Sequence, residues 1–256
     1  TLKPDFSETE FDKERAALIA PAIRMLLKDG DTSVVKFFTN TTVRALLKDR
    51  DSFYPISSAY SPDHIVYCKP EALFIEAAED LEAQYEAIQT GIEAYKKEKG
   101  FAPKVVCIQN LGFFAWGTSI KNAEICGEVF LDAVKIGVYN RNYGGPRFMT
   151  PYMIAFICNW EVESYRSKVS LAGGDGKRLN GKIAIVTGSA QGFGQGIADE
   201  MLKQGANVVI ADLNVQLAES NSAAMNEAYG KGLTIALGGD VSDEKSVRDM
   251  VYSTVL

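Results

Sequence analysis

Three glycines in the last third of the chain have the type and spacing needed to bring a backbone close to a phosphorylated ligand. Gly188, Gly192 and Gly194 lie between an apolar run, KIAIVTG (182–188), and a helix-like segment, QGFGQGIADEMLKQG (191–205). Such glycines let the chain turn sharply, let the backbone approach a pyrophosphate, and let the helix pack close to the sheet. The free N–H groups and partial positive charge at the helix N-terminus then favour phosphate.

An acidic residue follows these glycines at the spacing expected for ribose recognition. Asp212 lies near the end of the next apolar run, NVVIADL (207–213), 18 residues after Gly194. Its carboxylate can accept hydrogen bonds from the ribose hydroxyls and would repel a 2′-phosphate. The pattern therefore favours NAD over NADP as the cofactor.

A third apolar run, LTIALGGDV (233–241), supplies residues expected to contact the base. Asp240 is predicted to receive the adenine amino group, with Val241 against the ring. Strand, turn, helix, second strand and acid occur in the order that a dinucleotide site requires, whereas a turn that only packs a helix on a strand is the simpler alternative. The predicted cofactor-binding residues are Gly188, Ser189, Gln191, Gly192, Phe193, Gly194, Asp212, Leu213, Asp240 and Val241.

The TGxxxGxG spacing from Thr187 to Gly194 resembles the short-chain dehydrogenase/reductase family. The resemblance covers residues 178–256 and includes the GGDV at 238–241, and Phe193 replaces a more common aliphatic residue. It implies an α/β fold whose second part is the first half of a Rossmann-type doubly wound parallel sheet. Apolar strands joined by helices are typical of βαβ units, so we expect these strands to be buried on both faces.

The catalytic residues of that family are not predicted in this chain. The family resemblance implies a later Ser and a Tyr-xxx-Lys pair, and none follows the cofactor motif here. Tyr95 and Lys99 have the spacing but precede the motif in a run of charge at a helix end, so we interpret them as a solvated helix terminus and not as catalytic residues. We therefore expect an internal fragment of a longer protein, inactive by itself.

The glycine-rich and charged segment LAGGDGKRLNGK (171–182) is the predicted linker. It places a boundary near residue 175, with one module at 1–174 and the cofactor-binding half at 175–256. Alternating helical and strand-like patterns predict a layered α/β module before it. The predicted helices are 14–29, one after Asn40 or Thr41, 71–100 with a break near Gly91, and 119–140, and the predicted strands are 33–38, 64–68, 104–109 and 111–117.

Three stretches of the first module resemble the later part of a class II aldolase-like region. They are Ser61-Pro62-Asp63-His64, residues 103–137, and NWEVESYRSK (159–168). Their order, followed by the dehydrogenase-like segment, is similar to the bifunctional rhamnulose-1-phosphate aldolase/alcohol dehydrogenase family. The resemblance implies cleavage of a deoxy-sugar phosphate, a small-molecule substrate, and oxidation or reduction of lactaldehyde by the whole protein.

The chain departs from the metal-binding pattern of that family. It contains one histidine, His64, lacks a His-x-His pair, and has Gln109 where simpler class II aldolases have a histidine before glycine. A divalent metal, and with it aldol chemistry, is therefore expected only in the full-length protein. Three interpretations of His64 stay open. It is a structural residue, a substrate or metal contact completed by other residues, or a vestige or interface residue.

The overall composition narrows the function classes. The net charge of −6 and pI near 5.0 argue against nucleic-acid binding and against an anionic membrane surface. The polar N-terminus does not resemble a signal peptide, and four scattered cysteines without a CxxC favour a cytoplasmic protein with reduced thiols. A homo-oligomer is expected. Two alternatives stay open: a non-catalytic scaffold attached to a dehydrogenase, and a dehydrogenase with an unrelated N-terminal extension.

Overall fold

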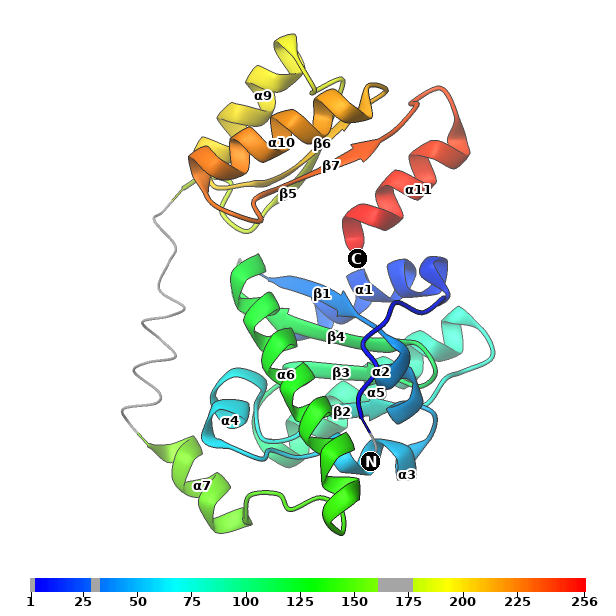
Figure 1. Ribbon diagram of the computed structural model, residues 1–256, viewed down its shortest axis with the longest axis vertical. Helices are drawn as coiled ribbons and strands as arrows, with labels where there is room; N and C mark the ends of the chain where they lie inside the picture. The colour runs from blue at the N-terminus through cyan, green and yellow to red at the C-terminus, as the bar shows by residue number, and fades with distance from the viewer. Residues whose placement is uncertain (1–2, 29–32, 161–176) are drawn as a thin grey trace.

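The structure, a computed structural model, describes residues 3–28, 33–160 and 177–256. Its helices and strands form two α/β units, one built on a four-stranded sheet and the other on a three-stranded parallel sheet (Figure 1). The α/β prediction with a parallel sheet is confirmed. The predicted boundary near residue 175 and the first half of the predicted linker, 171–176, lie outside the described residues.

The first unit has a mixed sheet of order β1-β4-β3-β2, in which β2 and β3 are parallel and the other two pairs are antiparallel. Its elements are α1 (Lys13–Leu27), β1 (Val34–Phe38), α2 (Thr41–Leu46), α3 (Arg50–Phe53), η1 (Tyr54–Ile56), α4 (Pro62–Cys68), β2 (Leu73–Ile75), α5 (Leu81–Lys99), β3 (Val105–Ile108), β4 (Gly112–Gly117), α6 (Ile120–Asn140), η2 (Arg141–Tyr143) and α7 (Pro151–Asn159).

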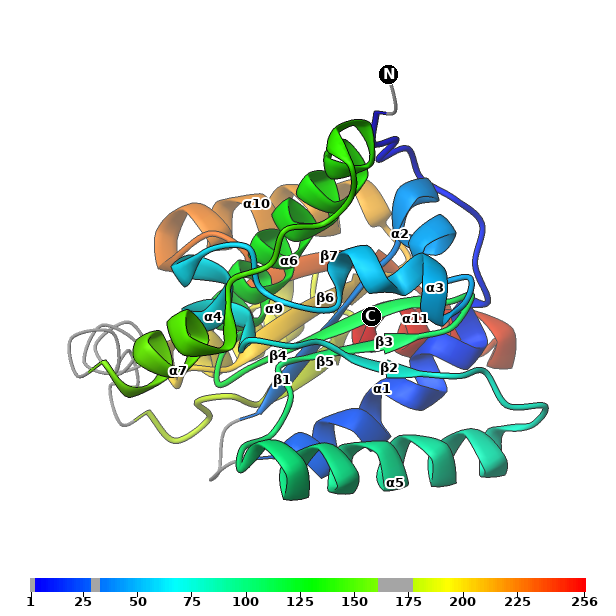
Figure 2. The same ribbon diagram turned by 90° about the horizontal axis from the view of Figure 1, so that it is seen from below.

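Helices cover both faces of this sheet, which explains why its strands are mostly apolar. Successive side chains of a strand point to opposite faces. Val105 and Cys107 accordingly pack in one core with α6, whereas Val106 and Ile108 pack in a second core with α1 and α5. Figure 2 shows α6 on one side of the sheet and α1 and α5 on the other.

Two sequence-based assignments in this unit are wrong. Residues 64–68, predicted as a strand, belong to helix α4, because Pro62 occupies its first turn and Ser61 caps the His64 N–H. A short apolar run has no periodicity that separates the two states, so the capping residues decide. The long helix predicted over 71–100 is instead strand β2 followed by α5.

Helix α5 also differs from the expectation. It continues through Gly91, where a Cβ atom would lie 2.3 Å from Ile75 Cδ1, so the glycine permits close packing on β2. Pro21 lies inside α1. Helix α7 was not predicted. The predictions of β1, β3, β4, α6 and the Asn40 cap of α2 are confirmed.

The second unit consists of β5 (Ile183–Thr187), α9 (Gly192–Lys203), β6 (Asn207–Asp212), α10 (Val215–Tyr229), β7 (Thr234–Gly238) and α11 (Glu244–Val255). The three strands are parallel in the order β5-β6-β7, and α9 and α10 pack on one face of them. This is the βαβαβ arrangement that the apolar runs predicted.

The expectation that all three strands are buried on both faces is wrong. Only the central strand β6 is buried along most of its length, while Ile183 in β5 is 42% exposed and Ile235 in β7 is 45% exposed. Both side chains lie on the sheet face opposite to the one that α9 and α10 cover, which leaves them partly exposed. The N-cap of α11 is Asp243, whose carboxylate accepts two backbone N–H groups.

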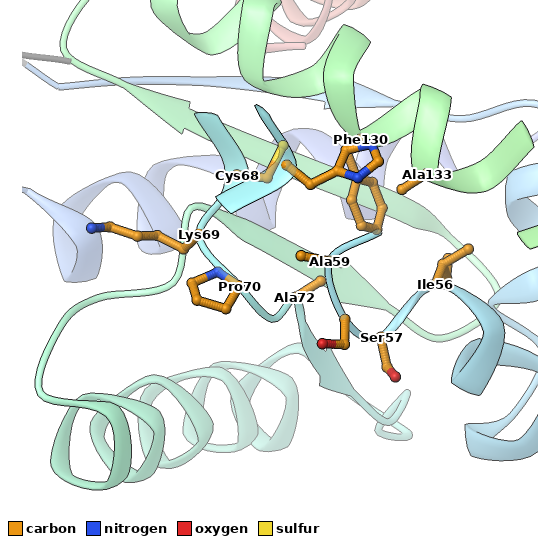
Figure 3. Close-up of a pocket in the computed structure, with 11 residues that line it drawn as sticks. Ile56, Ser57, Ala59, Cys68, Lys69, Pro70, Ala72, Phe130 and Ala133 are labelled. Atoms are coloured by element: carbon orange, nitrogen blue, oxygen red, sulfur yellow. The ribbon is translucent and has the colours of Figure 1, made fainter. Parts of the chain in front are cut away.

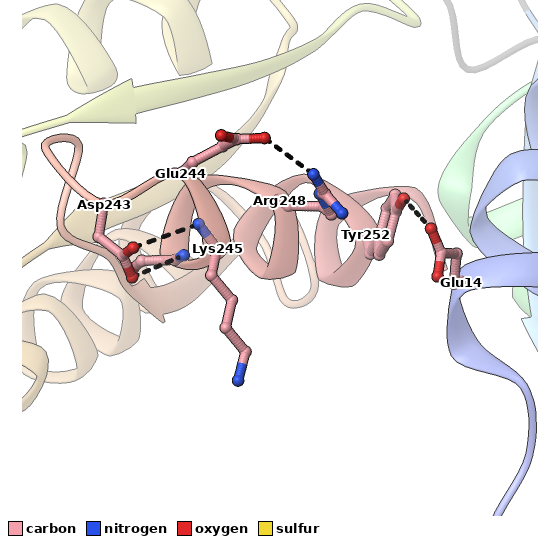
Figure 4. A network of polar contacts seen from close by, with 7 residues as sticks. Glu14, Asp243, Glu244, Lys245, Arg248 and Tyr252 are labelled. Carbon is pink, nitrogen blue, oxygen red and sulfur yellow. Dashed lines mark hydrogen bonds and ion pairs between the residues drawn. The ribbon is translucent and has the colours of Figure 1, made fainter.

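Helix α11 connects the two units (Figure 4). Its Tyr252 hydroxyl donates to Glu14 of α1 at 3.0 Å, and the Lys13 ammonium donates to the Ser253 hydroxyl at 2.8 Å. The apolar end of α11, at Val255, packs against the core between α1, α5 and the first sheet. The helix that follows the third parallel strand is therefore in direct contact with the first unit.

The space around Gly127 allows a test of how tightly α6 packs against the first sheet. A Cβ atom at Gly127 in α6 would lie 2.1 Å from the Phe38 ring, which stacks on Phe113. We expect Gly127→Ala to lower the free energy of unfolding by about 1–3 kcal/mol, as overpacked cores do. Urea unfolding followed by tryptophan fluorescence measures this, because both tryptophans lie in the first unit.

Gly196 is the matched control, because it also lies inside a helix but a Cβ atom added there would have no neighbouring atom within 4 Å. Gly196→Ala should leave stability unchanged or raise it by up to about 1 kcal/mol, measured by circular dichroism. Equal effects of the two substitutions would contradict the packing argument.

Candidate functional site

The glycine-rich turn joins the end of β5 to the start of α9. Gly188 and Gly192 both have φ of +63°, a left-handed conformation that glycine adopts without strain. Gly194 is required for a different reason, since a Cβ atom there would lie 2.2 Å from the Gly188 carbonyl oxygen. The turn therefore folds tightly against the first residues of the helix.

Asp212, at the end of β6, holds this turn against the neighbouring strand. Its Oδ2 accepts the Ala190 N–H at 3.1 Å and its Oδ1 accepts the Asn214 N–H at 3.0 Å. These backbone hydrogen bonds, that of Asn214 first, lower the pKa of the Asp212 carboxyl. A carboxylate has about four lone-pair positions, so the ionised group can still accept hydrogen bonds from a ligand.

Ser189 has a structural role in this geometry, although it was among the predicted cofactor-binding residues. Its side chain is fully buried, donates to the Val186 carbonyl at 2.5 Å and accepts the Ala211 N–H at 3.1 Å. Its backbone N–H donates to the Ala211 carbonyl. The side chain and the N–H are therefore both engaged within the protein.

The sequence interpretation missed Asn221, a buried polar residue of α10. Its Nδ2 donates to the Ser189 carbonyl at 2.9 Å, and its Oδ1 accepts from Gln195 Nε2 at 3.0 Å. Asn221 thus links the glycine-rich turn to two helices. The available signal was its spacing from Ala218 and Met225, which places a polar side chain on the apolar face of the helix.

The remaining predicted residues gather at one edge of the parallel sheet. Thr187 pairs with Ala211, and Asp212 pairs with Gly238, so the three strands end at the same level. Asp240 lies two residues beyond β7, and its Oδ1 accepts the Ser242 hydroxyl and N–H, which lower its pKa. Gln191 is the N-cap of α9, and the exposed apolar side chains are Phe193 (95%), Leu213 (74%) and Val241 (64%).

His64 has structural partners in the first unit. The imidazole is 5% exposed, its Nδ1 accepts the Tyr60 N–H at 3.2 Å, and burial lowers its pKa. Within residues 3–28, 33–160 and 177–256, no three His, Cys, Asp or Glu side chains cluster to hold a metal. The described residues therefore do not fit the divalent metal of a class II aldolase.

Tyr95 and Lys99 are likewise engaged within the first unit. The buried Tyr95 hydroxyl donates to the Glu71 carbonyl at 2.8 Å, and burial raises its pKa. Lys99 forms an ion pair with the Glu71 carboxylate at 2.7 Å. Both residues join α5 to the segment that leads into β2.

Comparison with known sequences finds a family pattern in the second unit. Residues 182–255 match the sequence profile of the short chain dehydrogenase family. The second unit therefore carries the sequence pattern of a short chain dehydrogenase on a parallel α/β sheet. In the part of the chain that the structure describes, no helix is long and apolar enough to cross a membrane.

Individual relatives cover different parts of the chain. It is 25% identical, over 92% of its length, to the uncharacterized oxidoreductase YuxG of Bacillus subtilis, and covers 37% of that protein. It is 39% identical to the 15-hydroxyprostaglandin dehydrogenase [NAD(+)] of Mus musculus over 30% of this chain and 29% of the relative. A Burkholderia phymatum short chain dehydrogenase/reductase structure in complex with NAD aligns with 25% identity and a TM-score of 0.29, over 30% of this chain and 27% of that one. The chain thus spans about a third of the length of these relatives.

The two hydrogen bonds that Asp212 accepts, from the Ala190 and Asn214 N–H groups, are called the Asp212 clamp below. They predict a pH-dependent contribution of Asp212 to the free energy of unfolding. Because its folded pKa is depressed, the contribution is present above the unfolded pKa of about 3.9 and is lost as the pH falls through the folded value. We expect Asp212→Asn to lower the unfolding free energy by about 1 kcal/mol at pH 7, and by less at pH 3. Urea titrations at both pH values measure the difference.

Glu227→Gln removes an exposed carboxylate from α10 and serves as the charge control. It should change stability little at either pH. A similar pH-dependent loss in this variant would show that general charge effects, and not the clamp, account for the result.

Proposed function

We propose that the second unit binds NAD at the carboxyl edge of β5, β6 and β7, and that the whole protein is an NAD-dependent short-chain dehydrogenase/reductase. The observation that carries this proposal is the position of Asp212. Its ionised carboxylate ends β6 beside a glycine-rich turn and helix N-terminus, so one edge offers both a ribose acceptor and N–H groups for phosphate.

The three glycines and two exposed apolar side chains have further roles that their geometry supports. The backbone of Gly188, Gly192 and Gly194 would follow the pyrophosphate, since glycine leaves no side chain in its way. Leu213 and Val241 are exposed apolar side chains that would contact the adenine ring. Bound NAD would supply hydride transfer, and the named [NAD(+)] relative supports this cofactor.

For the first unit we propose a class II aldolase-like module at 1–174, followed by the cofactor-binding unit at 175–256. The match to YuxG covers 92% of the chain, so it includes most of the segment before residue 182, and it lies within a longer protein named as an oxidoreductase. This supports an extended first module joined to a dehydrogenase. The whole protein would cleave a deoxy-sugar phosphate and oxidise or reduce the resulting lactaldehyde, as a small-molecule enzyme of the cytoplasm that forms homo-oligomers.

A second candidate is a first unit that serves as a scaffold. It is favoured by the structural bonding of His64 and by contacts between α1 and α11, through which the first unit holds the cofactor-binding unit. Aldolase activity of the full-length protein that depends on an added divalent cation would support the enzyme. Its absence alongside intact dehydrogenase activity would support the scaffold.

Cofactor selectivity is the sharpest test of the NAD proposal. We expect calorimetric titration to show at least about tenfold tighter binding of NADH than of NADPH, because Asp212 repels the 2′-phosphate. Asp212→Ala should reduce that ratio towards one. The ratio is the readout, since the loss of the clamp itself would weaken both cofactors alike.

Asp199→Ala is the matched control. Asp199 is an acid on α9 that pairs with Lys203 and Tyr229, away from the strand ends. It should leave the NADH to NADPH ratio unchanged. Tighter binding of NADPH by the unaltered chain, or an equal effect of both substitutions, would contradict the proposed role of Asp212. The titration should be repeated on the full-length protein.

A further inference from the structure

Two buried thiols of the first unit lie next to each other where α4 meets α6. Cys68 ends α4 and Cys126 lies in the second turn of α6, and they are 4% and 1% exposed. The Cys68 thiol donates to the Cys126 carbonyl oxygen at 3.2 Å. Adjacent thiols from separate helices are the starting geometry for a disulfide.

The surroundings of this pair give its two thiols different acidities. The neighbouring Cys68 thiol and the positive charge of Lys104 lower the pKa of Cys126, and burial raises the pKa of Cys68. The Cys126 thiol donates to the Lys104 carbonyl, with Sγ and oxygen 3.8 Å apart. Since cysteine reacts as the thiolate, any oxidation of the pair begins with the loss of a proton from one thiol.

A small cavity reaches one thiol of the pair, that of Cys68. Figure 3 shows Cys68 on its wall, together with Phe130 and Ala133 of α6. Its volume of about 10 Å³ for the centre of a water-sized molecule is close to the smallest that holds one water. Lys69 and Ser57 on its wall are half-buried, so it lies near the surface. Cys68 is therefore the thiol that a small oxidant such as a peroxide meets first when the cavity widens, whereas a tripeptide disulfide is far too large to enter.

We propose that Cys68 and Cys126 form a reversible disulfide when the protein is exposed to hydrogen peroxide. The Cys68 thiol, on the cavity wall, loses its proton and attacks a peroxide oxygen. The O–O bond breaks, the proton joins the leaving hydroxide, and a sulfenic acid and one water result. The second thiol, losing its proton, attacks the sulfenic sulfur; the S–O bond breaks, a second water leaves, and the S–S bond forms. The two thiols lose two electrons and the peroxide gains them.

The other two cysteines of the chain provide internal comparisons. Cys107 is buried in β3, and burial raises its pKa. Cys158 in α7 is exposed. The proposal therefore predicts selective linkage of a buried pair, whereas general oxidation would affect Cys158 first. The bridge would tie α4 to α6 and so restrain the helical face of the first sheet, independently of cofactor binding.

Mass spectrometry after peroxide treatment tests the proposal. The chain carrying Cys158→Ser, which prevents disulfides between molecules, is treated with hydrogen peroxide or with glutathione disulfide, alkylated and digested. We expect a linked Cys68–Cys126 peptide, two hydrogens lighter than the reduced pair, with peroxide and far less with glutathione disulfide. The Tm should rise by several degrees and return to its starting value with dithiothreitol.

Cys107→Ala is the matched control and should still form the linked peptide, whereas Cys68→Ala and Cys126→Ala should show neither the linkage nor the Tm shift. Because the linked peptide is read in a chain with both thiols intact, the test holds even where an alanine variant folds poorly. Linkage that appears only in urea, equally fast linkage with glutathione disulfide, or a bridge that includes Cys107 would overturn the proposal.

Discussion

The second unit depends on one carboxylate that joins two parallel strands through the turn between them. Asp212 ends β6 and accepts the Ala190 N–H, so the glycine-rich turn after β5 is fixed at the level where β6 ends. Ionised carboxylates form strong hydrogen bonds to backbone N–H groups, and this lowers the Asp212 pKa. The same group that shapes the turn thus provides the negative charge expected to select the cofactor.

A second layer of polar contacts supports this clamp from inside the unit. Ser189 connects the turn to the backbone of both strands, and Asn221 connects it to α9 and α10. Buried polar groups are stable only when paired, so these residues require the turn, the strands and the helices to be placed together. The turn is therefore held in place by contacts within the protein itself.

The first unit follows a different constraint, the close packing of helices on both faces of a mixed sheet. Gly91 and Gly127 leave room for Ile75 and Phe38, which allows α5 and α6 to approach their strands. Contacts of α11 with Glu14 and Lys13 then bring the two units together. Helix α11 follows the predicted base-binding residues Asp240 and Val241. Its contacts with the first unit therefore help to hold the segment next to that part of the proposed site in place.

The sequence alone determined the parallel strands of the second unit, the glycine-rich turn and the acid after it, because these depend on local periodicity and on positions that favour glycine. It also determined α1, α2 and α6 of the first unit. The helix at 64–68 was marked by its local cap, Ser61 with Pro62, which the strand prediction overlooked. Tertiary structure decided that the outer parallel strands are partly exposed. It alone placed Ser189 inside, paired Asn221 with the turn, and brought Cys68 beside Cys126. These features join residues 22 to 58 positions apart, and such distant pairs follow from the packing of whole elements and leave no local pattern in the chain.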